Sequence, residues 1–393
     1  MEAAKKFNRL KRGRGKGQPL YEQIRRQLVR KIDAGEFQPG QRLPSVSQMV
    51  KNWKVDYQTV NSALKRMELD GLIRCETGKG KGPVVTSQTA CGYSVMFLRW
   101  SNGGFPLEIT EGVRKFAEEK GMLFSIADVS SSHNDFINAI ARPVRVVDGI
   151  IVVPHDSPKF RNACLQAQAS GTKIVFVDVR LEDLNISSVS IDHIGGAHQA
   201  TRHLLDLHGL PVYCMGLTPY ISEQARMQGW AAAMRQHNFH EHEPYICETE
   251  HVDTRRASFL EISKAHNHKL ALELLREQKC KGEKTSIFSC NGCAAQSVYK
   301  AAAELDLQIG KDVYVAGFGD SPGCWQLPVP FTSIAQNWPD LGYEAANILF
   351  MEMAGALQHP MYCLLPAKLR IRQSSTGNSS GQPGIYDEQK RTA

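Results

Sequence analysis

The segment from Pro19 to Thr86 constrains the fold of this chain most tightly, because three short helical patterns follow one another with little room between them. The first pattern, PLYEQIRRQLVRKIDAGEF, is expected to end at Gly35. It places Ile24, Leu28 and Ile32 four residues apart, which is the spacing of one helix face. The tight breaks between the patterns are typical of a small domain in which each helix packs on the next.

The second and third helical patterns carry their own start signals. Ser45 is a good N-cap for the second helix, and Asp56 can cap the third. In the third helix, Val60, Leu64 and Met67 share one face and are expected to pack inward. The opposite face of the third helix is polar and is left for solvent or a ligand.

A Gly/Lys-rich hairpin follows the third helix. Apolar pairs at 72–73 and 84–85 predict two strands, and the tip between them holds the sequence GKGKG. Glycines let a backbone approach DNA closely, and lysines supply positive charge. A nucleotide-binding loop is an alternative, but the P-loop pattern is absent. Three helices and a hairpin predict a winged helix-turn-helix, which places its third helix in the major groove of DNA.

The candidate DNA contacts lie on the third helix and around it. Its first turns present polar side chains to base edges, and its later basic residues, together with the start of the second helix, are suited to phosphates. The predicted DNA-binding residues are Arg42, Ser45, Tyr57, Gln58, Thr59, Asn61, Lys65, Lys79, Gly80 and Lys81. The basic residues of the first helix are expected to be solvated: Arg25, Arg26, Arg30 and Lys31.

Charge is distributed very unevenly along the 393 residues. Residues 1–90 hold 19 basic and 8 acidic side chains, a net +11, whereas the remainder carries a net −4. A polyanion is therefore the expected partner of the first quarter of the chain. Within it, residues 1–18 form a basic arm, which is either a solvated tail or a segment that reaches phosphates or the minor groove.

Four motifs of this segment occur in the order and at the spacing of a known family. PLYEQI, GEFQPGQRLPS, TVNSALKRMELDGLI and the GKGKG tip resemble the GntR family of bacterial repressors. The family often has guanine-reading arginines just before and at the start of its third helix. Residues 55–58, Val-Asp-Tyr-Gln, contain none, so the resemblance implies no operator sequence.

From Tyr93 onward, apolar runs alternate with amphipathic helices. Buried β-branched runs such as DGIIVVP and KIVFVDV, separated by helices, predict an α/β fold with parallel sheets and helices on both faces. About 280 residues exceed one sheet, so two lobes with a cleft are expected. The predicted domains are 19–86 for the winged helix-turn-helix, 87–92 for a linker, 93–376 for the two-lobed body and 377–393 for a disordered tail.

The body carries further motifs in a recognisable order. VDGIIVVP, KIVFVDV, VSIDHIGGAHQATRHLL, the SxxxRxxGW of residues 222–230, SCNGCAAQSVYKAAAELDLQIGKDVYVAGFGD, PFTSIAQN and LLPAKLRIRQS resemble the LacI family effector domain. That domain has the periplasmic-binding-protein fold. A GntR-type head on a LacI-type body is the layout of the arabinose repressor group.

The resemblance implies a set of effector-binding residues. Arg226 matches an arginine that forks onto ligand oxygens, with a structural ion pair as its alternative. Trp338 matches an aromatic that stacks on a sugar, with core packing as its alternative. The complete implied set is Trp100, Asn102, Phe105, Arg226, Asn291, Asp320, Gln336 and Trp338.

Two departures from the LacI pattern affect this site. Gly292 stands where the family usually has an aspartate after Asn291, and Gly319 replaces another before Asp320. Two carboxylates that usually support or contact the ligand are therefore missing. A sugar remains the expected effector, with a different small molecule or a site that has drifted from inducer binding as alternatives.

Other chemistry finds little support. Cys290 and Cys293 form a lone C-x-x-C without a second pair, which is expected to be packing rather than zinc binding. The histidines at 237, 240, 242 and 251 have no metal-ligand spacing. No nucleophile elbow or paired carboxylates occur. We therefore expect no metal, no cofactor and no enzymatic activity.

These observations predict a cytoplasmic, ligand-controlled transcription regulator, most simply a repressor that binds operator DNA as a homodimer. The ten scattered cysteines suit a reducing compartment, and neither a signal peptide nor a membrane span is expected. A solute-binding protein for transport is one alternative, against which the basic head argues. An enzyme with an appended DNA-binding head is another, and it lacks a catalytic constellation.

Overall fold

A computed structural model describes most of the chain and divides it into two compact units. Unit 1 comprises residues 1–100, 105–189 and 338–362, and unit 2 comprises 101–104, 190–337 and 363–393. Unit 1 holds the N-terminal head and the first lobe of the body; unit 2 is the second lobe. The described residues are 10, 19–33, 35–69, 72–75, 82–86, 93–100, 107–129, 132–141, 143, 147–218, 220–248, 259–320 and 322–377.

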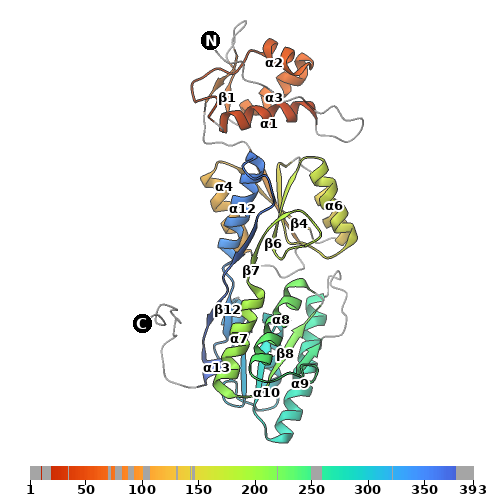
Figure 1. Cartoon of the computed structure of the whole chain (residues 1–393), viewed down its shortest axis with the longest axis vertical. Coiled ribbons are helices and arrows are strands. Elements are labelled where there is room, and N and C mark those ends of the chain that lie inside the picture. Colours follow the sequence, from red (N-terminus) through yellow and green to blue (C-terminus); the bar gives the residue numbers. More distant parts are fainter. Residues whose placement is uncertain are drawn as a thin grey trace. The chain divides into compact units, whose positions relative to one another are not determined.

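The head is a three-helix domain with a short hairpin, as the sequence predicts (Figure 1). Both predicted apolar stripes are buried, from Ile24 to Ile32 and from Val60 to Met67. Its elements are α1 (Leu20–Asp33), α2 (Val46–Trp53), α3 (Tyr57–Leu69), β1 (Ile73–Arg74) and β2 (Val84–Val85).

The hairpin gains a third antiparallel segment from residues 40–43. The amide of Gly40 donates to Val85 and the amide of Leu43 donates to Pro83. At Gly82 the two segments approach so closely that an added Cβ would lie 1.8 Å from the carbonyl oxygen of Leu43. Only glycine fits this crossing, which holds the wing against the start of the second helix.

The first lobe contains a six-stranded sheet in the order β13-β7-β6-β5-β3-β4. Parallel pairing joins β4 to β3, β3 to β5 and β5 to β6, as the buried apolar runs predict. Its strands are β3 (Ser94–Trp100), β4 (Leu123–Val129), β5 (Gly149–Val152), β6 (Lys173–Asp178), β7 (Ser187–Ile191) and β13 (Tyr362–Leu365). Its helices are α4 (Glu108–Glu119), α5 (His133–Ala141), α6 (Pro158–Ala169) and α12 (Trp338–Ala354).

Helices α4 and α12 lie side by side in this lobe (Figure 1) although more than 200 residues separate them in sequence. They cross through a pair of glycines. A Cβ on Gly112 would lie 1.8 Å from the carbonyl oxygen of Pro339, and a Cβ on Gly342 would lie 2.0 Å from that of Ile109. The two backbones therefore touch, and this crossing brings α12 into the lobe.

The second lobe contains another six-stranded sheet, in the order β14-β12-β11-β10-β8-β9. Only β14 (Lys368–Arg370) is antiparallel to its neighbour among the pairs described. The remaining strands are β8 (Val212–Leu217), β9 (Ile246–Glu248), β10 (Thr285–Ser289), β11 (Val313–Phe318) and β12 (Thr332–Ala335). Its helices are α7 (His193–His208), α8 (Ile221–Gln236), the 3-10 turn η2 (Glu243–Tyr245), α9 (Phe259–Lys281), α10 (Gly292–Glu304), α11 (Pro322–Trp325) and α13 (Gln373–Thr376).

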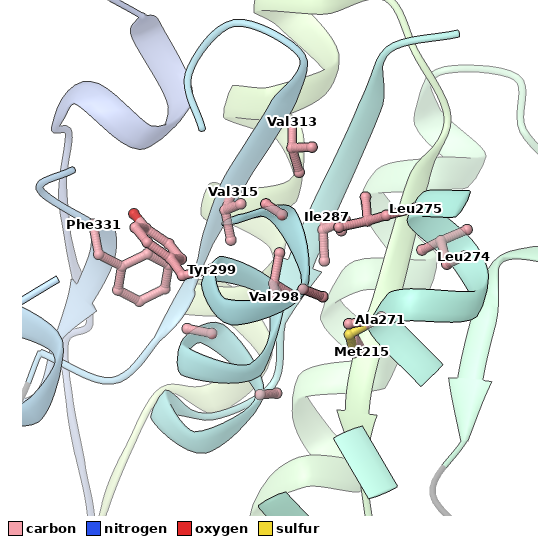
Figure 2. Packing of buried hydrophobic residues seen from close by; sticks show 14 of the residues in the cluster. Met215, Ala271, Leu274, Leu275, Ile287, Val298, Tyr299, Val313, Val315 and Phe331 are labelled. Carbon is pink, nitrogen blue, oxygen red and sulfur yellow. The ribbon is translucent and has the colours of Figure 1, made fainter. Parts of the chain in front are cut away.

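The core of this lobe lies between β8, β10, β11 and helices α9 and α10. Figure 2 shows Val298 of α10 next to Ile287 and Val315 of the sheet, and Tyr299 of α10 beside Phe331. These side chains are less than 10% exposed. Burying such aliphatic side chains stabilises a domain by roughly 1.5–3 kcal/mol each.

Two histidines of α7 hold the C-terminal helix α13 to the second lobe. His203 Nε2 lies 2.8 Å from the hydroxyl of Ser375, and His208 Nε2 lies 2.7 Å from the carbonyl oxygen of the same residue. The ring of His208 stacks on Tyr314 with centroids 3.5 Å apart. The predicted domain boundary at residue 376 thus falls at the end of a docked helix. The basic arm, apart from Leu10, and the linker lie outside the described residues, as does the tail after Gly377.

Candidate nucleic-acid interface and effector site

Helix α3 presents a polar, exposed face. Tyr57 is 56% exposed, which is high for an aromatic side chain of a small domain. Gln58, Asn61 and Lys65 are exposed on the same helix, whereas Val60 is fully buried. The helix is therefore anchored by its apolar side, and its polar side is free to enter a groove.

Asp56 caps α3 as predicted. The amide of Thr59 donates to Asp56 Oδ1 at 2.7 Å, and the hydroxyl of Thr59 donates to Oδ2 at 2.6 Å. Both bonds lower the pKa of Asp56, and the bond from the Thr59 hydroxyl has the larger effect. The hydroxyl of Thr59 is thus engaged within the helix cap. Its predicted contact with a base would use the methyl group or require that this bond break.

Ser45 also fulfils its predicted role as a cap. The amide of Gln48 donates to Ser45 Oγ at 3.3 Å, and the Ser45 amide donates to Gln48 Oε1 at 2.9 Å, which completes a capping box at α2. Arg42 is exposed and donates to the carbonyl oxygen of Gly82 at 3.0 Å, so it joins the wing to the segment that precedes α2. The predicted contacts at 79–81 lie outside the described residues.

Two arginines of α1 differ from the prediction that they are solvated. Arg25 is 5% exposed and pairs with Glu22 at 3.0 Å. Arg26 pairs with Asp148 of the first lobe at 2.7 Å. The prediction was wrong because a helical pattern shows which face lacks apolar residues but not which distant carboxylate covers it. Arg30 is exposed, as expected.

In the second lobe, the predicted effector residues gather where parallel strands end, which is the usual position of ligands in such sheets. Asn291 follows β10 and caps α10, because the amide of Ala294 donates to its side-chain oxygen at 2.9 Å. Its nitrogen donates to Gly216 at 3.1 Å and to Glu223 at 2.7 Å. Asn291 therefore links the ends of β8 and β10 to helix α8.

Sequence reasoning missed Glu223, which is central to this cluster. It is 6% exposed and accepts bonds from both the amide and the hydroxyl of Thr218, besides that from Asn291. Burial raises the pKa of the Glu223 carboxyl. Its position three residues before Arg226 on one helix was the available signal, since i and i+3 residues share a face.

Arg226 is buried beside these residues. Its Nη1 donates to the carbonyl oxygen of Cys290 at 2.6 Å and its Nε donates to His193 Nδ1 at 3.3 Å. The guanidinium carbon stands 4.0 Å from the ring centroid of Phe318. Bonds to one helix and a strand end, with an aromatic face behind it, hold the guanidinium plane in one orientation.

Asp320 forms ion pairs with two arginines, Arg370 of β14 and Arg372, which follows that strand. Arg372 Nη2 lies 2.9 Å from one carboxylate oxygen and Arg370 Nη1 lies 3.1 Å from the other. The hydroxyl of Ser333 also donates to Asp320 at 3.1 Å. The carboxylate is only 5% exposed, so its predicted role in effector binding stays a prediction, and its observed role is to fasten the edge strand.

The remaining predicted effector residues are less well defined. Gln336, in unit 2, is half-buried, and its amide nitrogen has no hydrogen-bond partner within the described part of the chain. Trp338, in unit 1, is half-buried and begins α12. The side chain of Trp100 and all of Asn102 and Phe105 lie outside the described residues.

Two of the potential metal ligands, Cys290 and His237, make ordinary contacts, and His251 lies outside the described residues. Cys290 is buried with its Sγ 3.5 Å from that of Cys214, and His237 bonds to Asp206 at 2.8 Å. Within the described ranges no three potential ligands converge on one point. No helix of the described part has both the length and the apolar character that a bilayer crossing requires.

Comparison with known proteins assigns both domains. Residues 20–82 match the model of bacterial regulatory proteins of the gntR family, and residues 201–375 match that of a periplasmic binding protein-like domain. The chain is a GntR-type head joined to a periplasmic binding protein-like body. Both predicted resemblances are confirmed.

Relatives with the same layout are transcriptional repressors. An arabinose metabolism transcriptional repressor of Halalkalibacterium halodurans is 23% identical over 344 residues, covering 84% of this chain and 88% of the relative. A repressor with the same description from Geobacillus stearothermophilus is 22% identical over 344 residues, which cover 84% of this chain and 90% of the relative. These proteins are transcription regulators rather than enzymes.

Solved structures support the fold. The complex of the transcriptional regulator CelR with cellobiose superposes with a TM-score of 0.61 at 19% identity, covering 84% of this chain and 95% of that one. The lac repressor dimer bound to operator and an anti-inducer gives a TM-score of 0.58 at 20% identity, covering 72% and 94%. The predicted α/β fold with parallel sheets is confirmed.

Proposed function

We propose that this protein is a transcriptional repressor whose binding to operator DNA is controlled by a sugar held in its body. The observation that carries the proposal is the exposed polar face of α3, with Tyr57 56% exposed, on a winged helix-turn-helix of net positive charge. Relatives named as arabinose repressors support the choice of a sugar.

The effector half of the proposal rests on the cluster of Arg226, Asn291 and Glu223. A fixed guanidinium and an amide at the ends of parallel strands suit the recognition of oxygen-rich small molecules. The carboxylates of Glu223 and Asp320 already accept several hydrogen bonds and ion pairs from the protein. Arg226 and Asn291 also donate already to groups of the protein, so a ligand in this cluster would exchange with some of these bonds.

We further propose a homodimer formed through α4 and β4. A groove of about 370 Å³ lies between this helix and this edge strand, and Ile126 within it is 39% exposed. An edge strand with exposed apolar residues needs a cover to avoid uncontrolled pairing. Arg114 and Glu118 also line the groove, so a two-fold related copy can place the arginine of one protomer near the glutamate of the other.

The DNA-binding half is tested with the full chain and a pool of random duplexes, selected over several rounds at low salt. A repressor enriches one pseudo-palindromic sequence, and its affinity falls steeply between 50 and 200 mM salt, as expected for several phosphate contacts. Equal retention of all duplexes, or none at low salt, would reject the proposal.

The effector is tested by thermal unfolding of the full chain with mono- and oligosaccharides, including arabinose and cellobiose. A bound sugar at 100 times its Kd stabilises the protein by about 2.7 kcal/mol. The same sugar must then change operator affinity. A sugar that stabilises the protein without changing operator affinity would favour the solute-binding alternative.

The dimer is tested by light scattering on Ile126→Asp. This change places a charge in the groove and should yield monomers. Leu165→Asp is the matched control, since Leu165 is 50% exposed on α6. Monomers from both variants, or from neither, would place the interface elsewhere.

A further inference from the structure

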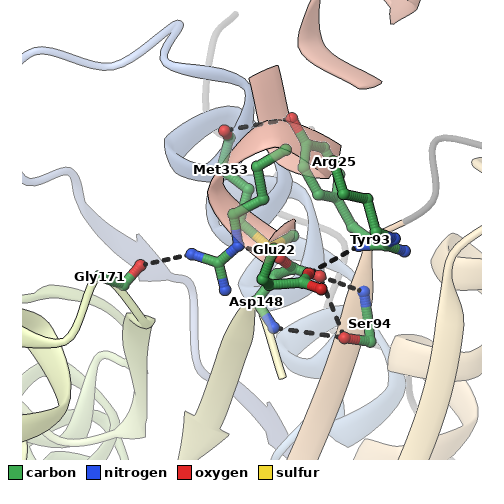
Figure 3. A network of polar contacts seen from close by, with 8 residues as sticks. Glu22, Arg25, Tyr93, Ser94, Asp148, Gly171 and Met353 are labelled. Carbon is green, nitrogen blue, oxygen red and sulfur yellow. Dashed lines mark hydrogen bonds and ion pairs between the residues drawn. The ribbon is translucent and has the colours of Figure 1, made fainter. Parts of the chain in front are cut away.

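A buried ion pair connects the DNA-binding head to the first lobe of the body. Nε of Arg26 lies 2.7 Å from Oδ1 of Asp148, and the two side chains are 12% and 4% exposed. Nη1 of Arg26 also donates to the carbonyl oxygen of Gly171 at 3.2 Å. Figure 3 labels Asp148 and Gly171 and marks the contacts of this network with dashed lines. The Nε–H is not aligned with Oδ1 as a hydrogen bond, so the contact with Asp148 is electrostatic.

The position of Arg26 on its helix explains why it points away from the head. Successive residues of an α-helix are rotated by 100°, so Arg26 lies about 200° from both Ile24 and Leu28. Those two side chains are fully buried in the head. Arg26 therefore has no role in the core of the head, and its partners all lie in the body.

Asp148 occupies a structural junction of the first lobe. Its Oδ2 accepts bonds from the amide and the hydroxyl of Ser94, at 2.8 and 3.0 Å. Its own amide donates to the carbonyl oxygen of Ser94, and its carbonyl oxygen accepts from the amide of Lys173. Asp148 thus ties together the amino ends of β3, β5 and β6 (Figure 3). A change in the relative position of these strands moves the carboxylate that Arg26 contacts.

We propose that Arg26 and Asp148 form a latch through which the first lobe sets the orientation of the DNA-binding head. The latch deepens the proposed function, because it supplies a route from the effector-binding body to the operator. An effector can act on DNA binding only if it favours one of two arrangements of the head and body, and a single buried contact that is made in one of them gives that preference.

The test is a double-mutant cycle in the full chain, read by hydrogen exchange of the amides at 93–96 and 172–174, next to the latch. Arg26→Met removes the charge and keeps the aliphatic stem. Asp148→Asn removes the other charge, and any effect it has through Ser94 cancels in the cycle. Arg30→Met is the matched control, because Arg30 is exposed on the same helix.

The latch predicts that Arg26→Met accelerates exchange at these amides by 5- to 30-fold, the factor for a loss of 1–2 kcal/mol, while Arg30→Met leaves it unchanged. Adding Arg26→Met to Asp148→Asn should change exchange little further. Equal effects of Arg26→Met and Arg30→Met on the exchange rates would overturn the proposal. So would a double mutant whose acceleration is the product of those caused by Arg26→Met and Asp148→Asn separately.

This result is independent of DNA. A latch detected in a protein that retains no duplex at low salt would leave the contact established and the proposed function rejected. If the protein binds operator DNA but the cycle shows no coupling between Arg26→Met and Asp148→Asn, the latch is rejected and the proposed function stands. Where both stand, Arg26→Met should reduce the ratio of operator affinities measured without and with the stabilising sugar, whereas Arg30→Met should leave that ratio unchanged.

Discussion

Gly319 lies so close to Gly292 that a Cβ added to Gly319 would stand 2.6 Å from the Cα atom of Gly292. Gly319 also has φ near +130°, a region that favours glycine. These are the two positions at which the LacI-type pattern has carboxylates. Their loss is therefore a single structural feature, in which two strand-end loops touch through their backbones.

Replacing Gly319 by Ala should destabilise the body, because the new Cβ adds both an unfavourable φ and a clash with Gly292. We expect a loss of about 1–3 kcal/mol and a lower midpoint of thermal unfolding. Gly282→Ala separates the two effects, since Gly282 has φ +71 and nothing within 4 Å of an added Cβ. Similar losses in both variants would mean that backbone strain alone, and not the contact, accounts for the result.

His203 predicts a pH dependence of stability. Burial, with the nearby His208, lowers the pKa of His203 to about 4. The unfolded side chain titrates near 6.5, so the unfolded chain binds more protons between these values. The free energy of unfolding that His203 contributes is therefore fully present above about pH 6.5. It falls by up to about 3 kcal/mol as the pH is lowered towards 4.

His203→Gln should flatten this dependence, because glutamine can bond to Ser375 but does not titrate in this range. The measurement is the thermal midpoint of the full chain between pH 4 and 7. His198→Gln is the control, since His198 is on the same helix and bonds to the exposed Gln236 side chain. An unaltered pH profile in His203→Gln would assign the dependence to other groups.

Arg226→Lys should disable effector binding while keeping the positive charge. An ammonium cannot reproduce the planar contact with Phe318 together with bonds to Cys290 and His193. We expect a stability loss of about 1–3 kcal/mol and no further stabilisation by the sugar that protects the wild type. Retained protection by that sugar would show that the guanidinium is structural only.

Gln58 and Lys65 should separate base recognition from phosphate binding. Gln58→Ala should cost about 1–3 kcal/mol of discrimination between operator and altered sequences, with little change for non-specific DNA. Lys65→Ala should weaken all sequences alike and reduce the salt slope by about one. Lys51→Ala, exposed on α2, is the control for Lys65. Identical profiles for Gln58→Ala and Lys65→Ala would contradict the assignment of Gln58 to bases.

Local patterns predicted much of the fold and part of the site. The apolar spacing of α1 and α3, the caps at Ser45 and Asp56, and the alternation of strands and helices depend on neighbours in sequence, so they could be read directly. The pairing of Arg26 with Asp148 could not, because the partners are 122 residues apart and only the folded lobe brings them together. The spacing of Glu223 to Arg226 was a local signal, but its bond to Asn291, 68 residues away, could not be read from neighbouring residues.

The glycine crossing of α4 and α12 sets an order of events during synthesis. The first lobe is interrupted after residue 189 and resumes only at residue 338, about 150 residues later. At 5–20 residues per second the ribosome needs roughly 7–30 s to make that stretch. Until then, the face of α4 that carries Gly112 has no α12 to cover it, and that face is open to chaperones or to misassembly.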